Sequence, residues 1–288
     1  MMSSFEYKPT DDSALIYHYC SPATLLLILQ NRTLRLSDVS CMNDSKELKW
    51  GIEVLHQVLS SSSLYEERRE RLQTTFGQYL TVLKLLAVCF SEEGDMLSQW
   101  RAYGADGTGF SVGFSGAEVR TMPGQAMQVT YDLEHQRSMW REGIVRIIQS
   151  AFRDKAVDLM KHDPTPEDVT KVMQDFSVLM LELGAMKSPA FREEREVRLT
   201  HPVVVVAKDD VKSIAYPNSA GSMPEIKFQM RGSKPCAFVD VPFITGVQPV
   251  REIVIGPKAD VDPEDIRILL GTLGYAGVMV RKSEISYR

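Results

Sequence analysis

The sequence predicts an α+β fold, with a mainly antiparallel sheet, flanking helices and a helical insertion. Short strand-like runs such as residues 14–19 and 85–90 alternate irregularly with amphipathic helical stretches. The regular βα alternation of a parallel sheet is missing. No long Pro-, Gly- or Ser-rich linker divides the 288 residues. We therefore expect a flexible leader at 1–13 and one domain over 14–288, with the insertion at about 133–186.

Local signals place the elements in chain order. Ser21 is a good N-cap and Pro22 suits a first helical turn, so a helix is expected to end near Asn31. Asp95 is expected to cap a short helix that the glycines of GADGTG (104–109) end. Further strands are expected at 33–38, 109–114, 127–131, 194–199, 203–207, 211–216, 225–230, 236–243, 252–257 and 277–282. Further helices are expected at 42–59, 65–83, 134–160, 165–183 and 264–275.

Composition and charge limit the class of protein. The net charge of −5 does not favour nucleic acid as a partner. No apolar run approaches the roughly 18 residues of a membrane span, and the N-terminus lacks the pattern of a signal peptide. The four cysteines are widely spaced, so we expect buried free thiols and a cytoplasmic protein. The sequence contains no G-x-S-x-G, H-E-x-x-H, C-x-x-C or P-loop motif.

His18, Tyr19 and Ser21 form the first candidate ligand-binding group, because they stand at the end of the first expected strand. An imidazole there can bind a ligand through its ring nitrogens. Alternatively, His18 is half-buried and caps the next helix.

Asn43, Asp44 and Glu47 form the second candidate group. They can face a ligand. Ordinary N-capping of the following helix explains the same three residues, since Glu47 stands three positions after Asp44.

Ser91, Trp100 and Tyr103 form the third group. They follow a strand, with Gly107 and Gly109 in the turn beyond. The two aromatic rings can stack on a planar ligand. Their near-helical spacing equally suits a packed core.

Glu194, Glu196 and Arg198 form the fourth group. In a strand they share one face, while Val197 and Leu199 point to the main core. Two neighbouring carboxylates suit acid/base or oxocarbenium chemistry, because one raises the pKa of the other. The alternative is a surface ion-pair ladder of little energetic worth.

The order of several motifs resembles the bacterial domain-of-unknown-function family 2971. They are IYHYCS, LRLSDVSCMNDSKEL, VCFSEEGDMLSQWRAYGADGTGFSVGF, KSPAFREEREVRL, EIVIGP and SEISYR. The resemblance runs from about residue 15 to the end and implies a fold more than an activity.

The opening of the domain, a strand with His18, a helix and the strand LRLS, is also similar to the ADP-ribosyltransferase fold of DarT-like enzymes. That resemblance implies NAD as cofactor, with His18 on the NAD ribose, Tyr103 or Trp100 stacked on nicotinamide, and Glu196 or Glu194 as the catalytic carboxylate. Arg198 would bind the pyrophosphate or pair with Glu196. The carboxylate would stabilise an oxocarbenium-like transition state as nicotinamide leaves.

Three functions remain open from the sequence. The first is an NAD-dependent ADP-ribosyl or glycosyl transferase, such as a toxin or phage-defence effector, whose acceptor the sequence does not name. The second is a non-catalytic nucleotide-binding or sensor domain. The third is a metal-dependent hydrolase or nuclease that uses Asp44, Glu47, Glu194 and Glu196 as ligands.

Overall fold

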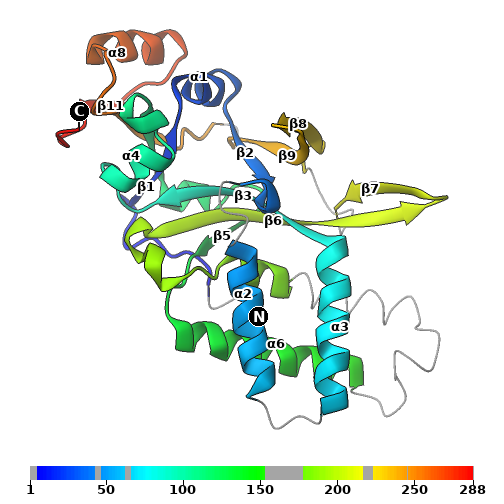
Figure 1. Cartoon of the computed structure of the whole chain (residues 1–288). Helices are drawn as coiled ribbons and strands as arrows, with labels where there is room; N and C mark the ends of the chain where they lie inside the picture. Colours follow the sequence, from blue (N-terminus) through cyan, green and yellow to red (C-terminus); the bar gives the residue numbers. More distant parts are fainter. Residues whose placement is uncertain are drawn as a thin grey trace.

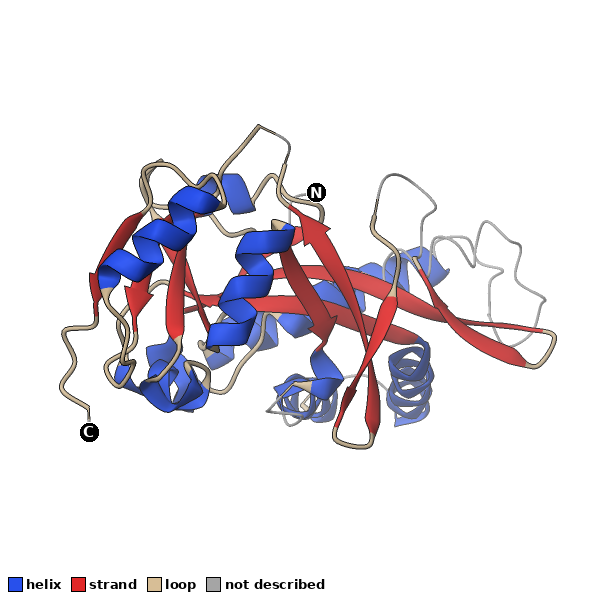
Figure 2. Ribbon diagram, turned by 90° about the horizontal axis from the view of Figure 1, so that it is seen from above, coloured by secondary structure: helices blue, strands red, loops and turns tan. Residues whose placement is uncertain are grey.

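The computed structural model describes residues 5–42, 47–61, 66–152, 178–216, 223–244 and 246–287. It confirms the α+β class, with an eleven-stranded sheet and helices on both of its faces (Figures 1 and 2). The strand order is β11-β10-β4-β1-β3-β2-β9-β8, and β6 adds to the other edge of β3, followed by β5 and β7. Strands β10 and β11 pair in parallel, and the other described pairings are antiparallel.

The elements have the following bounds. The strands are β1 (Leu15–Cys20), β2 (Thr33–Asp38), β3 (Leu83–Ser91), β4 (Phe110–Ser115), β5 (Gln125–Gln128), β6 (Glu196–Lys208), β7 (Val211–Ala215), β8 (Lys227–Arg231), β9 (Lys234–Pro242), β10 (Val250–Ile255) and β11 (Met279–Lys282). The helices are α1 (Pro22–Asn31), α2 (Glu47–Ser60), α3 (Glu66–Val82), α4 (Leu97–Ala102), α5 (Gly116–Val119), α6 (Leu133–Phe152) and α8 (Pro263–Thr272), with 3₁₀ turns η1 (Val39–Cys41), η2 (Ala105–Gly107) and η3 (Pro189–Glu194). Residues 178–184 are also helical.

The predicted cap at Ser21 is confirmed. Ser21 Oγ accepts a hydrogen bond from the Thr24 amide at 3.2 Å, and α1 ends at Arg32, whose φ of 52° is left-handed. Asp262 caps α8 in the same way, through the Glu264 amide at 2.9 Å. The α1 cap fixes the point where the chain leaves β1.

Two hydrophobic cores lie on opposite faces of the sheet. One packs α1 and α8 on the sheet, with Leu29 and Ile266 among its buried members. The other packs α2, α3 and α6 on the opposite face, with Leu55 and Trp140 as buried members. Figure 1 shows α2, α3 and α6 grouped below the sheet and α1 and α8 above it. Because both faces are covered, β4 is buried along its whole length and β3 is buried at most of its positions.

Two predicted strand boundaries were wrong. The strand expected at 194–199 begins only at Glu196, because Ser188 and Pro189 start a 3₁₀ turn that ends at Arg195 with a φ of 44°. The strands expected at 194–199 and 203–207 are one continuous strand, β6, which runs through Pro202. Figure 2 shows this strand and β7 projecting as a long ribbon beyond the helices.

The expected leader is also corrected. Phe5 and Tyr7 are only 3% and 2% exposed. The Tyr7 amide donates to Ala126 O at 2.9 Å, and Phe5 O accepts from the Gln128 amide at 2.8 Å. Backbone pairing with β5 therefore orders residues 5–7. The flexible leader was a wrong prediction there, since aromatic burial offsets the entropy of ordering the chain.

The prediction of buried free thiols is confirmed for Cys20 and is wrong for Cys41 and Cys236. Cys41 and Cys236 form a disulfide with a Cα–Cα distance of 6.0 Å, although 195 residues separate them. Cys20 and Cys89 are not disulfide-bonded. Sequence spacing could not show this pair, because β2 and β9 meet only in the folded sheet.

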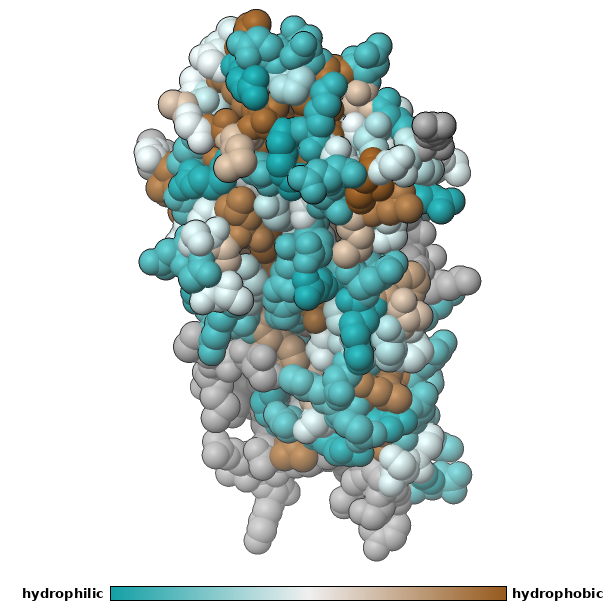
Figure 3. Space-filling view, turned by 90° about the vertical axis from the view of Figure 1, so that its left-hand side faces the viewer, coloured by the Kyte–Doolittle hydropathy of each residue, from teal (hydrophilic) through white to brown (hydrophobic). Residues whose placement is uncertain are grey.

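Within the described residues, no helix is long and apolar enough to cross a membrane. On the face drawn in Figure 3, hydrophobic residues form small separate groups among hydrophilic ones. Scattered groups of this size are ordinary on a protein surface.

Candidate functional site

The sheet opens beside the middle of β3, where β1 and β2 separate. Tyr17 of β1 pairs with Ser91, and Ser37 of β2 pairs with Ala87. Between those pairs, residues 88–90 have no strand partner on this edge within the described sheet. We call this opening the fork. It exists because α1, capped at Ser21, carries the chain away from β1 before β2 returns to β3.

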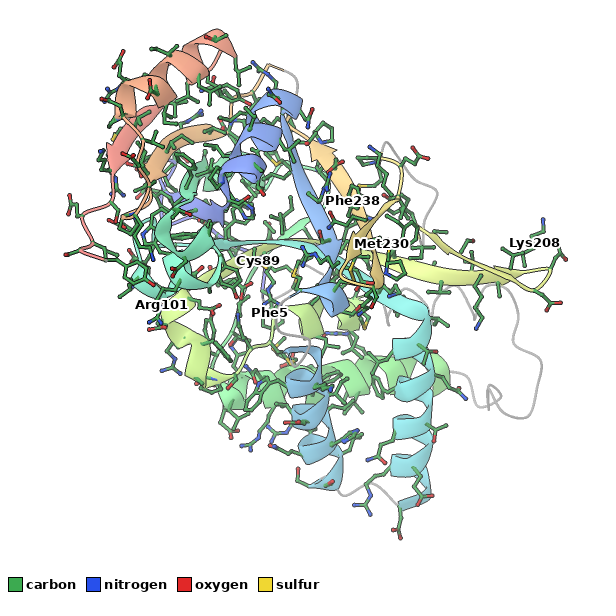
Figure 4. The ribbon with its side chains drawn as sticks, turned by 45° about the horizontal axis from the view of Figure 1, so that its top comes forward. Phe5, Cys89, Arg101, Lys208, Met230 and Phe238 are labelled. Carbon is green, nitrogen blue, oxygen red and sulfur yellow. A yellow bond between two sulfur atoms is a disulfide. The ribbon has the colours of Figure 1, made fainter. Side chains whose placement is uncertain are left out.

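A cavity of about 550 Å³ lies at the fork, and we call it the fork cavity. Its floor is the open edge of β3 at residues 88–90. Figure 4 places Cys89 near the middle of the molecule, with Phe238 and Met230 to one side on the β8–β9 hairpin. The volume is within the range of small-molecule and cofactor sites.

The two walls of the fork cavity differ in character. On the β1 side the lining includes Tyr17, His18 and Tyr19, with Tyr103 from the end of α4. On the β2 side it is polar and charged, with Arg35, Gln229, Arg231 and Asp240 from β2, β8 and β9.

His18 has a defined tautomer. Its Nδ1 lies 2.9 Å from the backbone carbonyl oxygen of Cys89, which can only accept, so Nδ1 carries the proton. Burial lowers the pKa of His18 against a smaller opposing effect of this hydrogen bond. The ring is therefore neutral at pH 7, and Nε2 is an acceptor without a hydrogen-bond partner among the described residues.

Four charged side chains form a buried cluster behind the floor, which we call the ion-pair cluster. Lys187 Nζ donates to Glu194 Oε2 at 2.5 Å and to Glu196 Oε2 at 3.0 Å. Arg198 donates from Nε to Glu196 Oε1 at 2.7 Å and from Nη2 to Oε2 at 2.8 Å. Glu194 and Glu196 line the fork cavity, whereas Lys187 and Arg198 stand behind them.

The ion-pair cluster keeps Glu196 ionised. Burial acts to raise the pKa of this carboxyl, but Arg198 and Lys187 outweigh it and hold the pKa well below its usual range. The expected pairing of two carboxylates that raise each other's pKa was therefore wrong for Glu196, because Lys187 lies between them. Burial also raises the pKa of Tyr103, with Glu194 adding to the effect, so its hydroxyl remains protonated.

The predicted face of β6 is confirmed in part. Glu196 and Arg198 share one face, and Val197 and Leu199 pack in the core on the other. Glu194 reaches the ion-pair cluster from η3, not from the strand. The surface-ladder alternative does not apply to Arg198, which is 2% exposed.

Lys187 is a residue that the sequence analysis missed. Its backbone carbonyl accepts from Gln136 Nε2 at 2.7 Å, and its amide donates to Thr130 O at 3.2 Å. Gln136 is fully buried and accepts from Trp50 Nε1 at 3.0 Å. Helices α2 and α6 thus position the lysine that neutralises the carboxylates. A lone Lys in KSPAF gives no local signal of this role.

Trp100 and Ser91 do not line the fork cavity. Trp100 is buried against Tyr19, and its Nε1 donates to Asp95 at 2.7 Å, so it is a core residue. Asp95 does not cap α4 as expected, because Met96 holds the N-cap position. Ser91 Oγ donates to Glu194 O at 2.8 Å and so fixes η3 beside β3.

Gly109 is required by close packing. A Cβ there would collide with the carbonyl oxygen of Cys20. The neighbouring Gly107 has a φ of 85° and packs on Pro257 and Tyr287. This glycine turn therefore joins β1, β4 and the C-terminal segment.

Tyr19 and Ser21 both line the fork cavity. The Tyr19 hydroxyl donates to Glu93 O at 2.8 Å, and Ser21 Oγ caps α1, so both side chains also have structural partners.

The second candidate group lies beyond what the structure describes. Asn43 and Asp44 are outside the described residues, as is the side chain of Glu47. In the described part of the chain, no group of three or more His, Cys, Asp or Glu side chains is arranged to hold a metal ion. Glu194 and Glu196 instead form ion pairs with Lys187.

Arg35 and Arg231 are the other residues that the sequence analysis missed. Arg35 pairs with Asp240 at 2.8 Å and lies over the Phe238 ring at 3.8 Å. Arg231 donates to the neutral carbonyl of Cys41 at 2.9 Å, so its charge is not compensated by that contact. The alternation of KFQMR was the available signal, since residues 227, 229 and 231 share one face of a strand.

A protein-family model described as "Protein of unknown function (DUF2971)" matches residues 99–199 of the chain. The matched segment contains Tyr103, Lys187 and the ion-pair cluster. Neither the curated proteins nor the solved structures contain a match to this chain. The expected similarity to the ADP-ribosyltransferase fold thus gains no support from these comparisons.

Proposed function

We propose that this protein binds a nucleotide in the fork cavity, with NAD as the first ligand to test. One observation carries the proposal: a single cavity has tyrosines and a neutral histidine on one wall and Arg35 and Arg231 on the other. A nucleotide has the matching parts, because its planar base stacks on aromatic rings and its phosphates attract guanidinium groups.

The individual contacts fit this ligand class. Tyr103 is 39% exposed and offers a ring for stacking. The Nε2 acceptor of His18 suits a ribose hydroxyl or an amide N–H. Arg231 has guanidinium donors beyond the one bonded to Cys41 O, and these suit a phosphate oxygen.

The test is calorimetric titration of the protein with NAD, ADP-ribose, AMP and adenosine. Tyr103→Ala should weaken binding of all four about tenfold, while Tyr103→Phe should not, since stacking needs only the ring. Arg231→Ala should weaken the three phosphate-bearing ligands about tenfold and leave adenosine unchanged. Arg192→Ala, at an exposed position in η3, is the control. Equal affinities in all variants would overturn the proposal.

ADP-ribosyl transfer from NAD is a second candidate. The observation that favours it is that His18, Tyr103, Glu194 and Glu196 line the same cavity. In the reaction the bond from ribose C1′ to the nicotinamide nitrogen breaks, and the electron pair leaves with nicotinamide. An acceptor nucleophile then bonds to C1′ and loses a proton.

The ion-pair cluster limits what Glu196 can do in that reaction. A carboxylate with a lowered pKa is a poor base, so Glu196 supplies a fixed negative charge beside the oxocarbenium-like transition state. The Glu194 side chain is more exposed than that of Glu196, at 13% against 6%, and this supports Glu194 as the group that would orient the acceptor.

Nicotinamide release, followed by chromatography, tests this second candidate. The parent protein should release nicotinamide. The rate of release should fall about a hundredfold in Glu196→Gln and should be unchanged in Glu193→Gln. Glu193 is an exposed neighbour and serves as the matched control. NAD binding without any nicotinamide release would overturn the transferase candidate and would support a non-catalytic nucleotide-binding function, as in a sensor domain.

A further inference from the structure

The Cys41–Cys236 disulfide lies at the β2 side of the fork cavity. Cys41 ends η1, and the next residue, Met42, lines the cavity. Cys236 is in β9, directly paired with Gln229, which also lines the cavity. The disulfide therefore joins two lining segments that are far apart in sequence.

Other links between these segments are weak. Arg231 donates to Cys41 O at 2.9 Å, and Lys234 Nζ donates to Ser40 O at 2.7 Å. Both hydrogen bonds are exposed, so water competes for each partner. The β2–β9 ladder holds the chain only as far as the Ser37–Phe238 pair. Beyond that pair, the covalent bond is the restraint that does not depend on exposed hydrogen bonds, and it holds the end of η1 and Met42 against the β8–β9 hairpin.

We propose that the Cys41–Cys236 disulfide is a redox-controlled clamp on the fork cavity, which tightens ligand binding when oxidised. The role in binding rests on the proposed function. The clamp holds Met42 and Arg231 in place before a ligand arrives, and such preorganisation improves affinity.

The reduction step requires a dithiol. Cys41 is half-buried and Cys236 is fully buried, so the first thiolate attacks Cys41 Sγ. A mixed disulfide forms, and Cys236 leaves as a thiolate that takes up a proton. The second thiol of the reductant attacks the mixed disulfide, releases Cys41 as a thiol and leaves as a cyclic or protein disulfide. Two electrons pass to the protein.

Cys89 provides a readout that needs no ligand. Its thiol is half-buried on the cavity floor and is not disulfide-bonded. When the clamp opens, a small alkylating reagent reaches that floor more readily. The alkylation rate of Cys89 therefore reports opening even if the cavity binds no nucleotide.

The experiment compares the full chain before and after dithiothreitol, beside a C41S/C236S double variant. Iodoacetamide labelling of Cys89 is followed by peptide mass spectrometry, and NAD affinity by calorimetry. Reduction should speed labelling about threefold and weaken NAD binding about fivefold. The double variant should behave as the reduced protein with or without dithiothreitol.

The outcomes separate the two proposals. Faster labelling of Cys89 with no NAD binding in either state would overturn NAD as the ligand and support the disulfide as a restraint on the cavity. NAD binding with equal affinity and equal labelling in both states would overturn the clamp. Failure to recover a Cys41–Cys236 peptide under oxidising conditions would also overturn it.

Discussion

His18 Nδ1 donates to the carbonyl oxygen of Cys89 at 2.9 Å, across the edge of β3 that β1 has already left. A side chain thus satisfies a backbone acceptor that a strand would otherwise satisfy. The fork stays open without leaving that carbonyl unpaired, and the imidazole is held in one tautomer.

His18→Asn should reduce the pH dependence of stability. Burial lowers the pKa of His18 in the folded state, so below about pH 6.5 the unfolded chain binds the extra proton and folding is disfavoured. Asn keeps an N–H for Cys89 O but does not titrate. Urea denaturation should show that the free energy of unfolding falls more in the parent than in His18→Asn between pH 7.5 and 5.5. The contribution of His201, whose pKa is also lowered, is the same in both proteins and so does not affect the difference.

Glu196→Gln should destabilise the protein by about 3–5 kcal/mol, because Lys187 and Arg198 would remain buried with an uncompensated charge. Chemical denaturation at pH 7 measures this, and Glu193→Gln should change the free energy of unfolding by less than about 0.5 kcal/mol. A loss as small as that of the control would contradict the ion-pair cluster as a stabilising unit.

Acid should remove the stabilisation that ionised Glu196 gives the parent protein. The folded pKa of Glu196 lies below its unfolded value near 4.5, so the stabilisation is complete above that pH and is lost as pH falls toward the folded pKa. A denaturation series from pH 6 to pH 3 should show a steeper decline in the parent than in Glu196→Gln. Parallel curves would contradict the lowered pKa.

Gln136→Leu should lower the free energy of unfolding by about 1–3 kcal/mol, because Trp50 Nε1 and the Lys187 carbonyl would lose a buried hydrogen-bond partner. A double-mutant cycle with Trp50→Phe isolates their coupling, which should exceed about 0.5 kcal/mol. Additive losses would show that Trp50 and Gln136 act independently.

Reduction of the disulfide should lower the free energy of unfolding by about 2–5 kcal/mol, since the bond closes a long loop in the unfolded chain. Urea denaturation with and without dithiothreitol measures the change. The free energy of unfolding of the C41S/C236S variant should not change with dithiothreitol. A change in that variant would show that the effect does not come from this disulfide.

The sequence by itself determined much of the local structure, although not the start of β6 or the cap of α4. Ser21 and Pro22 set the start of α1, and alternation along β6 separated Glu196 and Arg198 from the core residues Val197 and Leu199. These features depend on neighbours within a few positions, for which capping and side-chain periodicity are sufficient signals. The α+β class followed from the same signals.

Only the tertiary structure decided what the polar groups do. Lys187 meets Glu194 and Glu196 because helices α2 and α6 hold its backbone, and Cys41 meets Cys236 across 195 residues of chain. The fork itself arises where β1 and β2 separate along β3. Such contacts depend on strand order and helix packing, and no pattern of adjacent residues encodes them.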